Sequence, residues 1–277
     1  MRIDSHQHFW IYNKKNHQWI DDSMKKIRKN FLPSKLKLEL KKNKIDGSVL
    51  IQVDQTEEEN FFLLNQASNN SFIKGVVGWI NLRDNKLSEK LDYYSQNPIF
   101  KGVRHIVQSE KDNFFSNQRF RDGIAQLSKF NLTYDILIYP RHLLSTIEMV
   151  KKLPNNIFIL DHIGKPKISG EIDIKWKENI MELSKSENVY CKISGLVTEC
   201  EQYKWKNVEF KPYLDHILNC FGTKRVMFGS DWPVCLVAAD YNNVISIVKK
   251  YFKNFSENEL NQFFGDRKST RLNSSHQ

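Results

Sequence analysis

The feature that most constrains the fold is an alternation that runs along almost the whole chain. Short apolar segments rich in β-branched residues alternate with stretches whose apolar residues have helical spacing. Such an alternation predicts β/α units and a parallel sheet. Eight units at roughly 30-residue spacing match the size of a closed (β/α)8 barrel, about 250 residues. The expected strands lie in the segments 1–10, 45–53, 73–82, 100–108, 132–139, 157–163, 189–197 and 225–234.

An open, doubly wound sheet is the alternative arrangement of such units. That fold usually carries a glycine-rich turn after its first strand, where it binds a nucleotide. This chain has His6, Gln7 and His8 at the corresponding position. We therefore expect an α/β protein formed by a single (β/α)8 TIM barrel. Thr56, which is followed by three glutamates, is expected to be the N-cap of one of the helices between the strands.

The composition limits the partners of the protein. The formal net charge is +10, but the lysines are scattered over the expected helices and loops. A nucleic-acid footprint requires basic residues clustered on one face. No apolar run is long enough to span a bilayer, and the polar first residues lack the pattern of a secretory signal. We therefore expect a cytoplasmic protein that binds a small molecule and neither nucleic acid nor a membrane.

The cysteines give no sign of a metal knuckle or of a disulfide framework. None of the four shows C-x-x-C spacing. We expect them to be small buried hydrophobic residues, with Cys235 the one nearest to a pocket. The oligomeric state is not indicated by the sequence.

The end of the chain differs from the rest. Residues 257–264 have the apolar pattern of a last helix. Residues 266–277 are polar and without pattern, and they resemble the translation of a common sequencing adapter. We therefore expect a barrel domain of residues 1–265 that lacks its natural C-terminus, followed by a non-native tail. A genuine disordered tail is the alternative.

Two histidines separated by one residue stand at the end of the first expected strand. Residues i and i+2 of a strand point to the same side, so His6 and His8 face one direction. In a β/α barrel the carboxyl ends of the strands carry the active site. The pair is therefore a candidate for metal binding or proton transfer. Two solvent-facing histidines near a frayed terminus are the alternative.

Polar residues recur at the ends of the other expected strands. A barrel active site requires apolar runs that stop in such residues, because the strands converge there. The residues concerned are Gln52, Asp54, Trp79, Asn81, Arg104, His105, Asp161, His162, Lys165, Ser230, Asp231 and Trp232.

Asp231 is the strongest candidate for acid–base chemistry in this set. It follows Phe228 and Gly229 and lies at the rim of a buried strand, where a carboxylate can take a proton from a nucleophilic water. An N-cap of the following helix is an equally good interpretation. His162 could be a ligand, an electrophile or a hydrogen-bonded core residue. Arg104 could hold a carboxylate or carbonyl, or form a salt bridge across the barrel mouth.

Seven motifs, taken together and in order, resemble the lactonase branch of the amidohydrolase superfamily, which includes lactonases for L-fuconolactone, L-rhamnonolactone and 2-pyrone-4,6-dicarboxylate. The resemblance runs from Asp4 to about Gly265. An Asn-Ala followed by an aromatic pair, which usually ends the family's sequences, is absent. The motifs are D-S-H-Q-H-F-W, G-V-V-G-W-I-N-L, G-V-R-H-I-V-Q, L-T-Y-D-I-L-I, L-D-H-I-G-K-P, C-K-I-S-G-L-V-T-E and F-G-S-D-W-P-V.

The resemblance implies a (β/α)8 barrel that hydrolyses a sugar-acid lactone. Asp231 would act as the base on water, and the implied catalytic set is His6, His8, His162 and Asp231. The implied substrate-binding residues are Arg104, His105, Gln52 and Trp232.

The resemblance leaves the need for a metal ion open. The wider superfamily bridges two ions with a carboxylated lysine on the fourth strand and adds a histidine on the fifth. This chain has Arg104, His105 and Asp135 there, so the two-ion site is incomplete. A lactone is activated compared with an amide, so a base and one oxyanion contact can suffice without metal. We favour a metal-free or metal-optional enzyme; a single Zn²⁺ could still bind to His6, His8, His162 and Asp231.

Two other functions remain as alternatives. One is a metal-dependent decarboxylase of the same superfamily, which would bind metal tightly and release CO₂ from an aromatic acid. The other is a non-catalytic barrel that acts as a binding or scaffold protein. The motifs G-V-R-H and S-D-W-P-V favour the lactonases.

Overall fold

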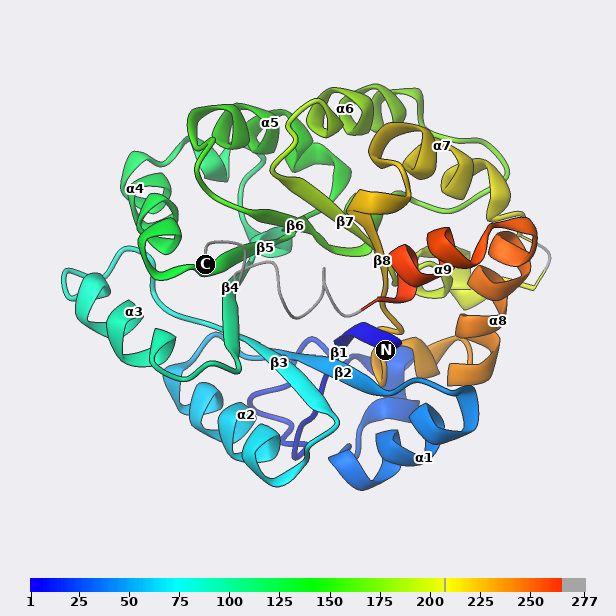
Figure 1. The fold of residues 1–277 in the computed structure, drawn as a ribbon, viewed down its shortest axis with the longest axis horizontal. Coiled ribbons are helices and arrows are strands. Elements are labelled where there is room, and N and C mark those ends of the chain that lie inside the picture. The colour runs from blue at the N-terminus through cyan, green and yellow to red at the C-terminus, as the bar shows by residue number, and fades with distance from the viewer. Residues whose placement is uncertain (207, 266–277) are drawn as a thin grey trace.

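The computed structural model describes residues 1–206 and 208–265, which form a ring of eight parallel strands surrounded by helices (Figure 1). Each strand pairs with the next along the chain, from the first to the eighth. The predicted (β/α)8 barrel is therefore confirmed. The strands are β1 (Ile3–Gln7), β2 (Gly47–Ile51), β3 (Ile73–Gly78), β4 (Phe100–Ile106), β5 (Thr133–Leu137), β6 (Phe158–Leu160), β7 (Val189–Ile193) and β8 (Val226–Phe228).

The ring closes between β8 and β1 through a few contacts rather than a regular ladder. Gln7 forms a parallel bridge with Trp232. The N–H of Asp231 donates a hydrogen bond of 2.9 Å to the carbonyl of His6, and the N–H of His8 donates one of 2.7 Å to the carbonyl of Trp232. The closure therefore brings Asp231 beside the end of β1.

The helices lie outside the ring of strands (Figure 1). The predicted N-cap at Thr56 is confirmed, because its side chain accepts a hydrogen bond from the N–H of Glu59. The last helix coincides with the predicted segment 257–264. The α-helices of the described residues are α1 (Pro33–Asn43), α2 (Glu57–Asn69), α3 (Leu87–Ser95), α4 (Gln118–Leu127), α5 (Leu143–Lys152), α6 (Ile174–Ser184), α7 (Lys211–Phe221), α8 (Tyr241–Tyr251) and α9 (Glu257–Phe264).

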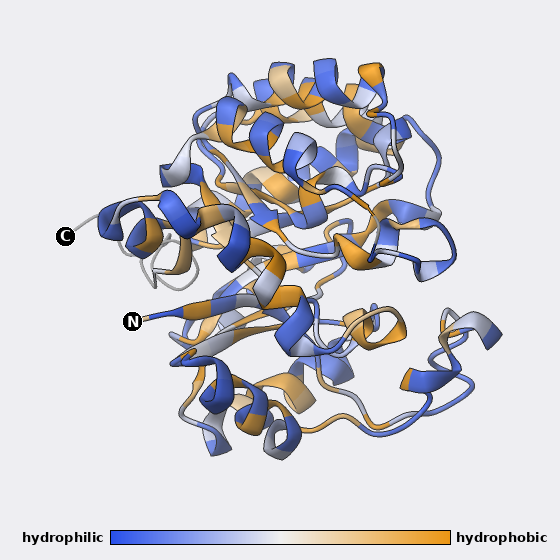
Figure 2. Ribbon diagram, turned by 90° about the vertical axis from the view of Figure 1, so that its right-hand side faces the viewer, coloured by the Kyte–Doolittle hydropathy of each residue, from blue (hydrophilic) through white to orange (hydrophobic). Residues whose placement is uncertain are grey.

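Most of the apolar core lies between the strands and the helices. Each helix carries both apolar and polar residues, visible as orange and blue stretches in Figure 2. In α7, for example, Tyr213, Leu214 and Ile217 are buried, as their helical spacing predicts.

None of the helices within the two described ranges is long and apolar enough to cross a membrane. The prediction of a non-native tail concerns residues 266–277, which lie outside the described residues.

All eight strands are shorter than the segments predicted for them. For two of them, β6 and β8, the backbone conformation of the residues that follow gives the reason. The segment 225–234 forms a strand only as far as Phe228, and Asp231 has a φ of 58°. The segment 157–163 forms a strand only as far as Leu160, because His162 and Ile163 have φ angles of 53° and 51°. Positive φ angles are incompatible with a β-strand.

The loops after the carboxyl ends of the strands lie at one end of the barrel. In Figure 2 the N-terminus, where β1 begins, is on the left, and these loops project to the right. The connection from β1 to α1 contains the 3₁₀ helix η1 (Asp22–Ile27). It contacts the 3₁₀ helix η10 (Val234–Val237) after β8, where Lys26 Nζ donates to the carbonyl of Val237 at 3.4 Å.

Candidate active site

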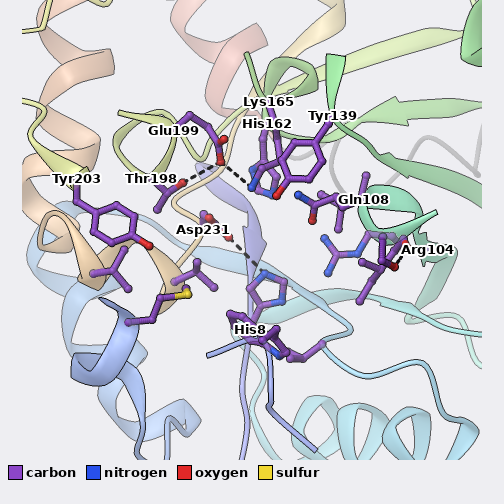
Figure 3. A pocket seen from close by; sticks show the side chains of 18 residues that line it. His8, Arg104, Gln108, Tyr139, His162, Lys165, Thr198, Glu199, Tyr203 and Asp231 are labelled. Carbon is purple, nitrogen blue, oxygen red and sulfur yellow. Dashed lines mark hydrogen bonds and ion pairs between the residues drawn. The ribbon is translucent and has the colours of Figure 1, made fainter. Parts of the chain in front are cut away.

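A cavity of about 550 Å³ opens at the carboxyl ends of the strands (Figure 3). His8, Arg104, His162 and Asp231, all singled out in the sequence, line it. Trp19 and Met24 of the β1–α1 connection and Tyr203 complete its wall. Barrel closure thus brings residues from both ends of the chain into one pocket.

Asp231 is a buried carboxylate placed directly after β8. Its Oδ1 lies 3.4 Å from Nε2 of His8 and 3.8 Å from Nε2 of His6. Burial by itself would raise the pKa of Asp231, but the nearby His162 and His8 outweigh burial and hold the pKa below its usual range. The carboxylate is therefore charged at neutral pH.

Asp231 does not act as the N-cap of a helix, which was the alternative interpretation of this residue. No side chain caps η10, which follows it, and the N-cap of α8 is Asp240, whose carboxylate accepts the N–H of Asn243. The side chain of Asp231 is free to face the pocket.

The two histidines of the first strand point together into the barrel mouth. Their Nε2 atoms are 3.1 Å apart. Nδ1 of His8 lies 2.9 Å from the carbonyl oxygen of Ile51. A carbonyl can only accept, so Nδ1 of His8 carries a proton and its Nε2 faces Asp231. His6 lies deeper, and burial lowers its pKa well below the usual value.

His162 approaches the pocket from the end of β6. Its ring centroid is 4.5 Å from that of His6, and its Nδ1 is 2.8 Å from Oγ of Ser194. Burial lowers the pKa of His162 to about 4. Its imidazole is therefore neutral at pH 7 and can act as a hydrogen-bond partner rather than a cation.

Arg104 on β4 supplies the positive charge of the inner pocket. Its Nη1 donates to Oδ2 of Asp161 at 3.0 Å and lies 3.3 Å from Nε2 of His6. Its Nη2 donates to Oε1 of Gln52 at 3.1 Å. These contacts fix the guanidinium fork, which also lines the cavity.

A group of buried charged residues lies next to His6, and two of them, Lys192 and Asp135, were not predicted to belong to the site. Lys192 on β7 contacts the carboxylate of Asp135 on β5 and reaches Oδ1 of Asp161 at 2.9 Å and Nδ1 of His6 at 3.3 Å. Burial alone would lower the pKa of Lys192, but the two carboxylates outweigh it and raise the pKa. The signal in the sequence is a charged residue in the middle of an apolar strand segment, as at Asp135 and Lys192.

Three residues expected to bind substrate lie outside the cavity wall. Gln52 is buried and orients Arg104. His105 follows Arg104 on the same strand and therefore points to the opposite face, where its ring stacks on Phe114 at 5.2 Å. The ring of Trp232 packs in an aromatic cluster, 5.2 Å from Phe31.

Two further charged residues line the pocket: Lys165, which the sequence places after the sixth strand, and Glu199, which was not predicted to lie there. Lys165 and Glu199 form an ion pair in which Nζ and Oε1 are 2.6 Å apart. The aromatic ring of Tyr139, also in the wall, lies 5.8 Å from the lysine Nζ. The two residues belong to the motifs L-D-H-I-G-K-P and C-K-I-S-G-L-V-T-E, but the motifs do not indicate that they pair.

A left-handed turn after β6 presents His162 and Lys165 to the cavity. His162, Ile163, Gly164 and Lys165 all have φ between 50° and 75°. This conformation is unfavourable for residues with a Cβ, above all for a β-branched one. Gly195, itself at φ 64°, leaves room for the turn, because a Cβ there would lie 2.7 Å from Nδ1 of His162.

The residues of the inner pocket fit one divalent ion. The distances among Nε2 of His6, Nε2 of His8 and Oδ1 of Asp231 are 3.1, 3.4 and 3.8 Å. Tetrahedral zinc ligands are separated by about 3.3–3.6 Å. A second group of potential ligands, His6, Asp161 and His162, is less suited, because Arg104 and Lys192 already neutralise Asp161.

A closed barrel that gathers imidazoles, a guanidinium and a charged carboxylate in one pocket at the carboxyl ends of its strands has the architecture of a TIM-barrel enzyme. The amidohydrolase family model matches residues 3–266, nearly the whole chain. The chain belongs to the amidohydrolase family.

Individual relatives agree with this assignment. L-fucono-1,5-lactonase from Burkholderia multivorans is 34% identical over 263 residues, which cover 91% of this chain and 88% of that protein. An amidohydrolase from Burkholderia multivorans, crystallised with bound zinc, superposes with a TM-score of 0.94 at 33% identity over 98% of both chains. A dihydroxybenzoic acid decarboxylase from Polaromonas with bound manganese reaches a TM-score of 0.66 at 14% identity over 98% of this chain and 97% of its own, a likeness that concerns the fold alone.

Proposed function

We propose that this lactonase opens the ring of a sugar-acid lactone and that Asp231 activates the attacking water. One observation carries the proposal. A buried carboxylate that stays charged lies in the pocket beside His8 and within electrostatic reach of His162, with Arg104 in the same wall (Figure 3). The likeness to L-fucono-1,5-lactonase supports the lactone class.

In the proposed first step, water gives a proton to the carboxylate of Asp231 while its oxygen attacks the carbonyl carbon of the lactone. A carboxylate of low pKa is a weak base, but a lactone carbonyl is an activated electrophile. General-base catalysis of this kind contributes about 10²–10⁴-fold in rate.

In the second step, the ring C–O bond breaks and the ring oxygen takes the proton from Asp231. The charge that develops on the carbonyl oxygen needs a hydrogen-bond donor. Arg104 contributes its positive charge in the cavity wall. His162 offers Nε2–H when the hydroxyl of Ser194 donates to its Nδ1. The product is the open-chain hydroxy acid, which contains one added water.

For the substrate we propose an aldonolactone such as L-fuconolactone or L-rhamnonolactone. The named relative acts on L-fucono-1,5-lactone. The pocket also combines two cationic and two anionic side chains, Arg104, Lys165, Glu199 and Asp231. Such a lining suits an uncharged ligand with many hydroxyl groups better than an apolar aromatic acid.

We infer that a metal ion is optional for this reaction. A single divalent ion held by His6, His8 and Asp231 would supply Lewis acidity that lowers the pKa of water to about 7. Arg104 already brings a positive charge to the same imidazole, with Nη1 3.3 Å from Nε2 of His6. The base and the oxyanion contact both come from the chain itself.

A panel of aldonolactones in a pH-indicator assay, with and without a chelator, tests the proposal. We expect at least one sugar lactone to be opened, with a rate that the chelator leaves within about threefold. If no lactone is opened, the proposed function is wrong. Loss of all activity in chelator, restored by Zn²⁺, would contradict the optional role of the ion. Release of CO₂ from dihydroxybenzoate would favour a decarboxylase instead.

A further inference from the structure

The ion pair of Lys165 and Glu199 occupies one wall of the pocket, and the proposed ring-opening chemistry does not use it. The lysine comes from the left-handed turn after β6, and the glutamate from the 3₁₀ helix η7 (Val197–Glu199) after β7. Figure 3 shows the pair on the opposite side of Asp231 from His8. Only 16% and 15% of the two side chains is exposed, and both line the cavity.

The pair offers a hydrogen-bond donor and an acceptor side by side. One oxygen of Glu199, Oε1, contacts Lys165 and, at 3.5 Å, the hydroxyl of Thr198. The other oxygen, Oε2, makes no hydrogen bond to the described part of the chain. An ammonium group has three donors, of which the glutamate takes one. Free donors and a free acceptor therefore lie next to each other in the cavity wall.

A second pair, two residues further along the same segments, makes the contrast clear. The two segments run in parallel, with a bridge between Ile168 and Cys200. Lys167 and Glu201 lie 3.9 Å apart, but 70% and 73% of their side chains is exposed. An exposed pair of this kind contributes little to stability or recognition.

A purely structural role does not explain why the inner pair is withdrawn from water. Burial of two charges costs desolvation energy that apolar residues of similar size would avoid. Lys165 is also held at φ 50°, in a strained conformation of the kind that is concentrated at functional sites. Both observations indicate that the pair serves the ligand.

We propose that Lys165 and Glu199 form a subsite that recognises two neighbouring hydroxyl groups of the lactone ring. A hydroxyl both donates and accepts, so a vicinal diol matches an ammonium beside a carboxylate. The charged partners make these hydrogen bonds strong. The inference rests on the proposed function and deepens it, because it makes this pair the part of the pocket that selects hydroxylated lactones.

The test compares Lys165→Met, Glu199→Gln and Glu199→Asp with the matched control Lys167→Met/Glu201→Gln. Two measurements are made on the full chain: KM and kcat for the best lactone of the panel, and the Kd, by calorimetry, of the corresponding 1,5-anhydroalditol. That compound keeps the ring hydroxyls but has no carbonyl, so its binding does not depend on catalysis. Glu199→Asp keeps the charge and draws the carboxylate back by one methylene, and thermal melting confirms that each variant is folded.

We expect KM and the anhydroalditol Kd to rise together by about tenfold or more in the subsite variants, the effect of losing a charge-assisted hydrogen bond. kcat should change by much less, and the control should match the wild type. Unchanged polyol binding in folded variants, or a loss of kcat at constant KM, would overturn the subsite. If the wild type binds the anhydroalditol through this pair but opens no lactone, the proposed function fails and the subsite stands.

Discussion

At the residue scale, the pocket keeps the carboxylate of Asp231 charged and the imidazoles of His6 and His162 neutral. Burial alone raises the pKa of a carboxyl group and lowers that of an imidazole. At Asp231 the neighbouring histidines reverse the effect of burial, whereas at His162 burial prevails and the pKa falls to about 4. A charged base beside neutral hydrogen-bond partners is the combination that water activation needs.

The low pKa of His162 predicts a specific dependence of stability on pH. Because its folded pKa of about 4 lies below the unfolded value of 6.5, the unfolded state binds more protons between these values, and stability falls as the pH falls through this window. From pH 7 to pH 5 the loss due to this residue is about 2 kcal/mol. When the pH is lowered from 7 to 5, the free energy of unfolding measured in urea should fall by this amount more in the wild type than in His162→Asn. A pH-independent difference would refute the assignment.

The sequence predicts which strand ends are polar but not every direction in which their side chains point. Arg104 and His105 are adjacent, so only one can face the pocket, and nothing in the motif says which. The ring stacking of His105 on Phe114 depends on a neighbouring 3₁₀ segment whose position the sequence does not predict. Lys192 was missed for a related reason, since its partners, Asp135 and Asp161, come from other strands.

At the scale of single elements, the turn after β6 depends on the turn after β7. The left-handed residues His162 to Lys165 carry two pocket side chains, and Gly195 gives them room. Sequence reasoning extended the strand through this turn, because its apolar and β-branched residues favour a strand. The positive φ angles are imposed by packing, including the hydrogen bond of 3.0 Å from Trp176 Nε1 to the carbonyl of Ile163.

Gly195→Ala should therefore damage both stability and catalysis. An alanine at position 195 would have to adopt a left-handed backbone conformation, at a cost of about 1–2 kcal/mol. Its Cβ would also clash with the ring of His162. We expect urea unfolding to show at least this loss and kcat/KM to fall by about tenfold or more. Gly170→Ala is the control, because a Cβ there meets nothing within 4 Å. Equal behaviour of the two variants would contradict the proposed dependence.

At the scale of the whole molecule, the eightfold alternation predicts the architecture because it is a local and repeated signal. The strands, their order and the last helix follow from periodicity. The closure between β8 and β1 does not, because it consists of isolated contacts such as the bridge of Gln7 and Trp232. This closure places Asp231 beside His6 and His8, more than two hundred residues away in the chain.

The most direct test of the central claim is kcat of Asp231→Asn on the lactone that the wild type opens fastest. Asp92→Asn on α3 is the control, because this exposed carboxylate, a hydrogen-bond partner of Gln96, lies far from the pocket. We predict that kcat falls by roughly 10²-fold or more in Asp231→Asn, while the control keeps the wild-type value. A folded Asp231→Asn variant with undiminished kcat would show that the carboxylate brought in by barrel closure is not the base.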